Sequence, residues 1–165
     1  MAKKTDDKSN KPNKKPAGPR ISNQKARHDY HIRETLECGV ELVGTEVKSL
    51  RAGQAKIDEA YVRLRDGELF LVGANIATYP LAGPLMQHEP TRDRRLLVHR
   101  RQIAALVTHV KQKGKTIVPL TVYFHRGWAK VEIALAEGKK MFDKRQDLKS
   151  KQAQRDIQRE MNRRR

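Results

Sequence analysis

The chain has 165 residues, of which 37% are hydrophobic, so it can supply one modest core but not two. Its 36 Lys and Arg residues outnumber 19 Asp and Glu residues, and the net charge of +17 is typical of a protein that binds a polyanion. No apolar run approaches the roughly 20 residues that span a bilayer, and no apolar signal segment follows the basic N-terminus, so we expect a cytoplasmic protein with no membrane partner.

The basic charge is concentrated at the two ends of the chain. Residues 1–27 hold nine basic and two acidic side chains, residues 138–165 hold eleven and four, and the 110 residues between them hold sixteen and thirteen. Residues 1–22 combine Lys, Asn and three prolines with almost no apolar side chain, which predicts a disordered basic arm. Neither end has the broad apolar face of an interfacial membrane helix, so nucleic acid is the favoured polyanion.

Strand-like patterns begin after this arm. Apolar spacing predicts one strand over residues 30–36 and a second over residues 40–43, which leads into a short helix. We expect Thr45 to cap this helix, Glu46 to lie in its first turn, and Gly53 to adopt the left-handed conformation beyond its end.

The middle of the chain predicts a hairpin, another strand and a long loop. Asp66-Gly67 suits the positive φ angles of a tight turn between the apolar runs 61–64 and 69–71. A further strand is expected around residues 75–79. Residues 80–95 contain three prolines and end in several arginines, which is typical of a long loop with a basic exit.

The last part of the domain predicts a helix followed by two strands. Apolar residues at helical spacing indicate a helix over residues 100–113, closed by Gly114. Two strands are expected around Arg126-Gly127, with Pro119 marking an edge or a bulge. About six strands and two helices predict a mainly β fold, a small antiparallel barrel that is closed or nearly closed.

Residues that could carry catalysis or bind a metal are few. His28 and His31 would face opposite sides of a strand, and no second cluster completes a ligand set. The pair Asp58-Glu59 has no obvious partner, which leaves a nuclease as a weak alternative. The single cysteine, Cys38, is expected to be a packed small side chain. We therefore expect no catalytic residue, no metal and no cofactor.

Six short motifs follow one another in order over residues 23–150: RHDYHI, GTEVKSLRAG, YVRLRDGE, PTRDRRLL, VPLTVYF and GKKMFDKR. Together they resemble the small protein B family, the SsrA-binding proteins of bacteria. The resemblance implies an oligonucleotide-binding-like β-barrel over residues 23–137 that binds transfer-messenger RNA. It also implies delivery of the alanine-charged RNA to the A site of a stalled ribosome, with elongation factor Tu as an indirect partner through that RNA, so that the ribosome is rescued and the nascent peptide is tagged by trans-translation.

The resemblance also assigns RNA contacts within the barrel. They map onto Asn23, Glu37, Leu97 and Lys130 of this chain. Leu97 could instead be ordinary core, and Lys130 a solvated strand residue. Glu37 is the most informative of the four, because a carboxylate repels phosphate and is useful mainly where it accepts hydrogen bonds from a base or a sugar.

The short helix after the second predicted strand is expected to support this face. We expect Lys48 and Arg51 to contact phosphate and Glu46 to have an internal partner. An alternative is a helix that plugs one end of the barrel with its charged residues in water.

Residues 138–165 form a basic C-terminal tail with no Gly or Pro after Gly138. They are helix-prone but lack a broad apolar face, so we expect the tail to be unfolded when free and helical on the ribosome, with Ile157 and Met161 on a narrow apolar stripe. An alternative is a solvated basic tail that only raises general affinity. The resemblance implies that the tail enters the decoding centre and the vacant message channel of the small subunit, with hinge motifs matched by Gly138, Lys139, Lys140, Asp143, Lys144 and Arg145.

Two other functions would use the same charge. A general RNA chaperone would bind RNA without a defined partner, and a ribosome-associated protein would bind ribosomal RNA permanently. Preference for transfer-messenger RNA over bulk transfer RNA at physiological salt separates them from the function that the resemblance implies.

Overall fold

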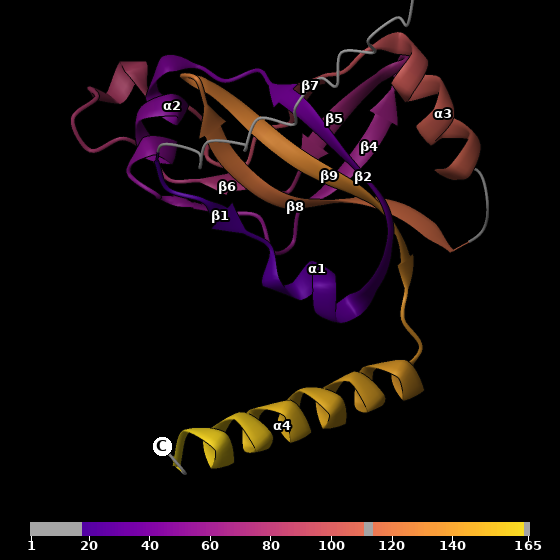
Figure 1. Cartoon of the computed structure of the whole chain (residues 1–165). Coiled ribbons are helices and arrows are strands. Elements are labelled where there is room, and N and C mark those ends of the chain that lie inside the picture. The colour runs from indigo at the N-terminus through magenta and orange to yellow at the C-terminus, as the bar shows by residue number, and fades with distance from the viewer. Residues whose placement is uncertain (1–17, 111–113, 164–165) are drawn as a thin grey trace, which may run out of the picture.

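The computed structural model of the chain describes residues 18–110 and 114–163. Within these ranges the elements in chain order are β1 (Ile21–Ser22), α1 (Gln24–Asp29), β2 (Tyr30–Val40), α2 (Gly44–Arg51), β3 (Ala55–Lys56), β4 (Tyr61–Arg65), β5 (Glu68–Val72), β6 (Asn75–Ile76), a 3-10 helix (Pro84–Met86), β7 (Arg94–Leu97), α3 (Arg100–Val110), β8 (Lys115–His125), β9 (Trp128–Gly138) and α4 (Met141–Arg163) (Figure 1).

Six strands close into a ring, which confirms the predicted barrel. The neighbours run β8-β4-β5-β7-β2-β9, and an antiparallel pairing of β8 with β9 completes the circle. The short strand β1 adds to β8, and β3 and β6 form a separate two-stranded sheet. Closure matters because it leaves few unpaired strand edges and gives the barrel one continuous outer surface.

The two tight hairpins form where the sequence predicts them. Asp66 and Gly67 have φ angles of 53° and 78°, and Arg126 and Gly127 have φ angles of 50° and 85°. Positive φ at both central residues matches the turn to the twist of the flanking strands, so β4 pairs with β5 and β8 with β9. Pro119 adjoins a register shift in β8, as expected of a residue that cannot donate to the ladder.

The segment before α2 differs from the prediction. Residues 30–36 and 40–43 are not two strands: Tyr30–Val40 is one strand, β2, because Gly39 makes no turn and pairs with both neighbouring strands. A register shift marks a bulge between Ile32 and Glu34. Helix α2 has Val43, not Thr45, at its N-cap, because the Thr45 hydroxyl lies 2.8 Å from His88 Nδ1 instead. Gly53 has the expected left-handed conformation, with φ of 74°.

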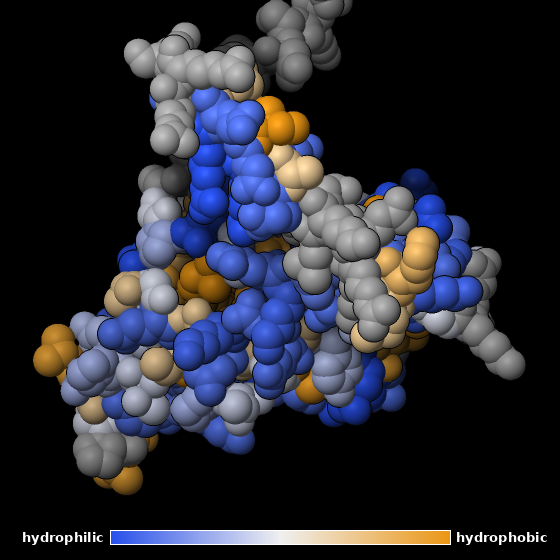
Figure 2. Space-filling model, turned by 90° about the horizontal axis from the view of Figure 1, so that it is seen from below, coloured by the Kyte–Doolittle hydropathy of each residue, from blue (hydrophilic) through white to orange (hydrophobic). Residues whose placement is uncertain are grey.

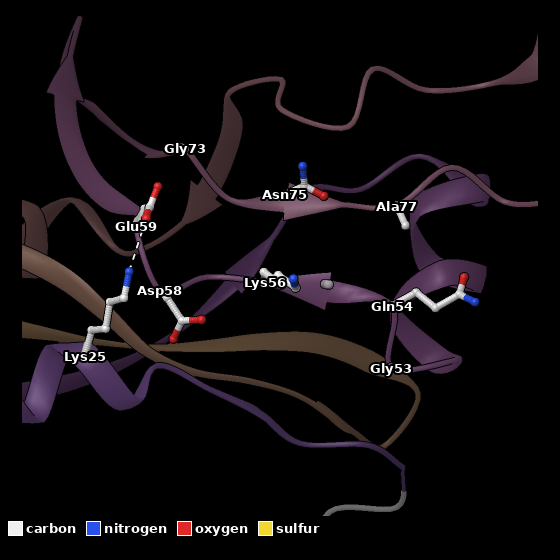
Figure 3. Close-up of a pocket in the computed structure, with 10 residues that line it drawn as sticks. Lys25, Gly53, Gln54, Lys56, Asp58, Glu59, Gly73, Asn75 and Ala77 are labelled. Carbon is white, nitrogen blue, oxygen red and sulfur yellow. Dashed lines mark hydrogen bonds and ion pairs between the residues drawn. The ribbon is translucent and has the colours of Figure 1, made fainter.

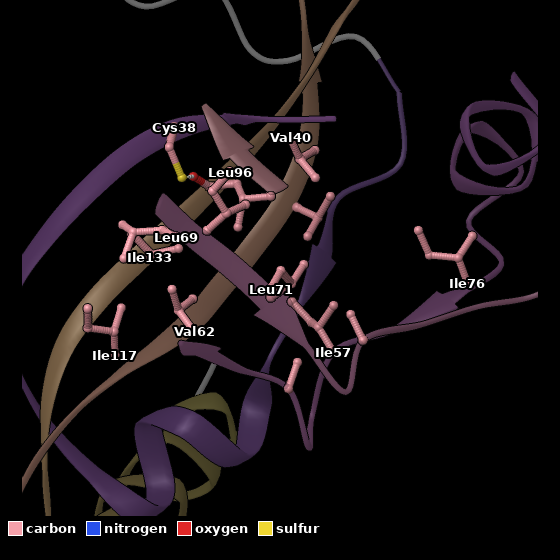
Figure 4. Packing of buried hydrophobic residues seen from close by; sticks show 14 of the residues in the cluster. Cys38, Val40, Ile57, Val62, Leu69, Leu71, Ile76, Leu96, Ile117 and Ile133 are labelled. Atoms are coloured by element: carbon pink, nitrogen blue, oxygen red, sulfur yellow. Dashed lines mark hydrogen bonds between the residues drawn. The ribbon is translucent and has the colours of Figure 1, made fainter. Parts of the chain in front are cut away.

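The main core fills the barrel. Buried apolar side chains from all six ring strands meet there, and Figure 4 shows Val62, Leu69, Leu71 and Ile133 among them. Cys38 belongs to this core: its thiol donates to the carbonyl oxygen of Val131 at 3.2 Å, and burial raises its pKa to about 12. The thiol is therefore a packing group, as the sequence predicts.

A second, smaller core lies outside the ring beneath α1. Ala26 packs there on Val118, Leu120, Ala134 and Ala136. Because side chains alternate along a strand, β8 and β9 bury one set of residues inside the barrel and the other set under α1. This double burial explains why their sequences are nearly continuous apolar runs.

The boundary between the predicted arm and the barrel falls differently in the structure. The expected disordered arm lies mostly in residues 1–17, outside the described residues, but Ile21–Ser22 at its end form β1 and pair with β8. Residues 141–163 are helical in this structure, and the expectation that the tail is unfolded until it meets the ribosome stays a prediction. Helix-prone residues throughout α4, and close pairs such as Asp156 with Arg159 at 3.8 Å, account for the helix.

Helix α4 extends below the barrel and is joined to it through the end of β9 (Figure 1). Figure 2 shows the molecule from this side, mainly hydrophilic, with hydrophobic residues in small separate groups. Among the described helices, α4 included, there is none with the length and apolar content needed to span a membrane.

Candidate nucleic-acid interface

A row of paired residues crosses four neighbouring strands on the outside of the barrel. Leu97 of β7 pairs with Gly39 of β2, Gly39 pairs with Lys130 of β9, and Lys130 pairs with Tyr123 of β8. Residues directly opposite each other in antiparallel strands lie on the same face. Leu97 is 51% exposed, so this face is the outer one and Leu97 is not a core residue. We call these four residues and Glu37 the outer row.

Glu37 lies two residues before Gly39 and therefore on the same face of β2. Its side chain is 47% exposed, and Lys130 Nζ lies 3.3 Å from Oε1. The Tyr123 hydroxyl donates to Oε2. These two groups, Tyr123 first, outweigh desolvation and lower the pKa of Glu37, while burial and the Glu37 bond raise the pKa of Tyr123 to about 12. The carboxylate is thus charged, oriented and open to solvent.

Two further residues at this face, Tyr123 and Arg20, were not predicted from the sequence as part of the site. The Arg20 guanidinium lies 5.7 Å from the centre of the Tyr123 ring and 3.6 Å from Glu132. A signal for Tyr123 was available, because its neighbours Val122 and Phe124 are apolar and alternation places the residue between them on the opposite face. No local pattern indicates that Arg20 reaches this ring.

Asn23 does not join the outer row. Its side chain is buried, accepts a hydrogen bond from the backbone amide of Ala26 at 2.8 Å and donates one to the carbonyl of Ile57 at 2.9 Å. It is the N-cap of α1, which is the role that Asn commonly takes at a helix start. The RNA contact that the resemblance assigns to Asn23 does not fit this geometry, because its polar groups are already used inside the protein.

Glu46 has the internal partners that the sequence predicts. Its fully buried carboxylate accepts hydrogen bonds from Arg92 at 2.9 and 2.6 Å and from Arg94 at 2.8 Å, and the Val43 amide donates to it at 2.9 Å. Arg94 is itself fully buried. The network ties the start of α2 to the segment that enters β7, and so holds the end of the long loop in place.

Lys48 and Arg51 lie on the exposed side of α2. Each cation sits over an aromatic ring: Lys48 Nζ is 5.1 Å from the centre of Tyr79, and the Arg51 guanidinium is 5.4 Å from the centre of Phe124. Stacking limits the side-chain freedom of both residues while their charged groups face solvent. They are placed to approach an anion, although their contact with phosphate stays a prediction.

The long loop between β6 and β7 is closed by one side chain. The amide of Gln87 accepts from the Tyr79 backbone amide at 3.1 Å and donates to the carbonyls of Tyr79 and Ala82 at 2.6 and 3.0 Å. Leu85 and Met86 lie at its exposed tip. A groove of about 560 Å³ separates this tip from the start of α2.

The root of the tail is attached to α1. The backbone amide of Lys139 donates to the carbonyl of Asp29 at 2.9 Å, and its ammonium group donates to the carbonyl of Arg27 at 3.0 Å. Asp143, in the first turn of α4, accepts from the Lys140 amide at 3.2 Å and lies 3.5 Å from His31 Nε2. The segment that matches the hinge motif thus joins β9 to α4 and is hydrogen-bonded to α1.

Farther along α4, Ile157 and Met161 are exposed and lie one turn apart, which is the predicted narrow stripe. Gly138 ends β9, and Lys144 and Arg145 fall within α4. The described residues thus leave this stripe open to a partner.

The carboxylates Asp58 and Glu59 line a groove of about 610 Å³ beside β3 and β6 (Figure 3). Glu59 is 3.1 Å from Lys25 Nζ. In the described part of the chain no three His, Cys, Asp or Glu side chains gather closely enough to hold a metal ion.

Known proteins resemble this chain over most of its length. Residues 20–163 match the family described as SmpB protein. The SsrA-binding protein of Trichormus variabilis is 52% identical over 139 residues, which cover 84% of this chain and 90% of that protein. The SsrA-binding protein of Salinispora tropica is 54% identical over 143 residues, covering 87% and 89%.

A solved structure is similar in sequence and in fold. It is described as "tmRNA-SmpB: a journey to the center of the bacterial ribosome" and is 48% identical to this chain, with a TM-score of 0.64. The match covers 75% of this chain and 87% of that one.

Proposed function

This chain belongs to the SmpB protein family, and from that membership we propose that it binds transfer-messenger RNA and delivers it to stalled ribosomes for trans-translation. The observation that carries the proposal is the outer row, where a charged and oriented carboxylate at Glu37 stands beside Lys130 and exposed Leu97. Such a surface offers hydrogen-bond acceptance and apolar contact as well as positive charge.

In this proposal the barrel binds the transfer-messenger RNA, and the tail enters the decoding centre and the message channel of the ribosome. The ring of six strands closes without α4, so the RNA surface does not depend on the tail. Helix α4 carries basic residues such as Arg155 and Arg159 beside its narrow apolar stripe, which suits a channel walled by RNA. The proposal assigns the chain no catalytic step, and it places the chain in the cytoplasm with the ribosomes.

The first test separates specific from general RNA binding. Full-length protein is bound to labelled transfer-messenger RNA and challenged with bulk transfer RNA at physiological salt. Retention against an excess of competitor supports the proposal. A general RNA chaperone or a permanent ribosomal RNA binder would lose the labelled RNA in proportion to the competitor, because electrostatic attraction alone does not discriminate.

The second test separates the tail from the barrel. Truncation after Glu137 should leave binding of transfer-messenger RNA nearly intact and abolish tagging of stalled peptides in a reconstituted translation system. Ala153→Pro is the matched control, because it keeps every charge of the tail but breaks α4. If the tail only adds charge, Ala153→Pro will tag at the normal rate. Normal tagging by the truncated protein contradicts the decoding role.

A further inference from the structure

We propose that the groove between the tip of the β6–β7 loop and the start of α2 binds one unstacked nucleotide of transfer-messenger RNA, with the base between apolar walls and a phosphate on Lys48. Figure 1 shows this loop beside α2. The inference rests on the proposed function and goes beyond the outer row, because it assigns the RNA a second contact at a different part of the fold.

The tip of the loop exposes large apolar side chains on a backbone that is held in place. Leu85 is 102% exposed and Met86 is 78% exposed. The Gln87 amide makes three hydrogen bonds across the loop, and the Met86 amide donates to the carbonyl of Gly83 at 2.9 Å. Pro84 fixes one φ angle at the tip. Large apolar side chains that a preorganised loop holds in solvent indicate a binding surface.

The groove beside this tip is apolar on both sides. Leu85 and Met86 line it from the loop, and Val43, which is 46% exposed, lines it from the start of α2. Gly44 has no side chain to fill the space, and a Cβ added there would meet no atom within 4 Å. The volume of about 560 Å³ lies within the range of pockets that hold a small ligand.

Lys48 is the lining residue whose charge remains available to a ligand. Its ammonium group lies 5.1 Å from the centre of the Tyr79 ring, which restrains the side chain without neutralising it. Among the residues that the structure describes, no carboxylate forms an ion pair with Lys48. The other polar side chains of the groove already have partners inside the protein; they are Thr45, Gln87, His88 and Arg92.

A nucleotide fits a groove that offers apolar contact and one unpaired positive charge. Every base has a face that packs on apolar side chains, and Leu and Met are among the residues that insert between stacked bases. Every nucleotide also carries a phosphate, which Lys48 can approach. Because the remaining polar groups are engaged, the groove has few groups left to read a base edge, and we expect it to accept any of the four bases.

Position and charge favour RNA over a protein as the occupant. Gly39 of the outer row and Val43 are four residues apart, so at most about 14 Å of chain separates them. At about 3.4 Å for each stacked nucleotide, a strand of roughly four nucleotides covers that distance. An RNA that contacts the outer row can therefore reach the groove, and the net charge of +17 attracts a polyanion.

The test probes transfer-messenger RNA with a reagent that acylates 2′-hydroxyl groups, first free and then bound to the full-length chain. An unstacked nucleotide reacts faster than a stacked one, so one nucleotide should gain reactivity severalfold on binding. The gain should be lost when Leu85→Ser and Met86→Ser are combined. Leu81→Ser is the matched control, because Leu81 is 84% exposed in the same loop but does not line the groove, and it should keep the gain.

Two further variants test the phosphate contact and the tolerance for bases. Lys48→Gln should weaken binding and reduce the slope of log affinity against log salt by about 0.7, as expected for one phosphate contact on a single strand. Lys56→Gln is the charge-matched control, because Lys56 is exposed on β3 outside the groove, and it should keep the reactivity gain. Replacing the reactive nucleotide by each of the other three should leave the gain in place.

The outcomes separate the groove from the proposed function. If no nucleotide depends on Leu85 and Met86, or if Leu81→Ser abolishes the same gain, the groove does not bind a nucleotide and the inference is wrong. If the double variant loses peptide tagging while its RNA reactivity is unchanged, the occupant is a protein, which also overturns the inference. Loss of preference for transfer-messenger RNA by the unchanged chain would contradict the proposed function instead.

Discussion

Replacing Glu46 by Gln should destabilise the barrel strongly, because it removes the counter-charge of a buried arginine. Arg94 is fully buried, and Glu46 is its charged partner at 2.8 Å. The other hydrogen bonds of Arg94 go to backbone carbonyls, which satisfy its N–H groups but do not balance its charge. Breaking a buried pair from one side costs about 3–5 kcal/mol.

The lower end of that range applies here, because Arg92, the other partner of Glu46, is 30% exposed and is partly screened by water. A loss of about 3 kcal/mol in a domain of this size corresponds to a fall in Tm of roughly 10 °C. Urea unfolding followed by circular dichroism measures the change. Glu68→Gln is the matched control, since its pair with Arg95 lies at the surface and is worth at most about 1 kcal/mol. Equal losses in the two variants would refute the reasoning.

The same variant should change how stability depends on pH. Burial by itself raises the pKa of Glu46, but the hydrogen bonds from Arg92 and Val43 and the charges of the two arginines outweigh it, so the pKa lies below its ordinary value of 4.5. The unfolded chain therefore takes up this proton at a higher pH than the folded one. Stabilisation by Glu46 is present above about pH 4.5 and is lost as the pH falls below it, and Glu46→Gln should lack this component.

Three further predictions concern a turn, the thiol and the tail. Gly127→Ala should cost about 1–2 kcal/mol in unfolding free energy, because Gly127 has φ of 85°, whereas Gly83→Ala, in an extended conformation with open space around it, should cost little. Equal costs would contradict the turn geometry. Cys38, with its pKa near 12, should react with a thiol reagent only after denaturant unfolds the barrel, and rapid labelling of the folded protein would contradict its burial. The circular dichroism difference between the full chain and the chain truncated after Glu137 should be helical. A coil-like difference would contradict a helical free tail and support the unfolded free tail expected from its lack of a broad apolar face.

The parts of the fold that depend on neighbouring residues could be predicted from the sequence. The Asp66-Gly67 turn, the left-handed Gly53 and the β-rich composition follow from the conformational preferences of a few adjacent residues, and these preferences act before any tertiary contact forms. The same holds for the excess charge at the two ends. The function class followed from that charge together with motifs whose order carried the family resemblance.

Long-range pairing between strands determined which polar side chains are buried and which are exposed. Tyr123 reaches Glu37 across 86 residues and Arg94 reaches Glu46 across 48, so no local pattern could show that the first carboxylate is half exposed and the second fully buried. The family resemblance assigned Asn23 an RNA contact, but the structure buries its side chain as the cap of α1. Whether a polar side chain meets solvent or an internal partner depends on which strands become neighbours when the ring closes, and only the tertiary structure contains that information.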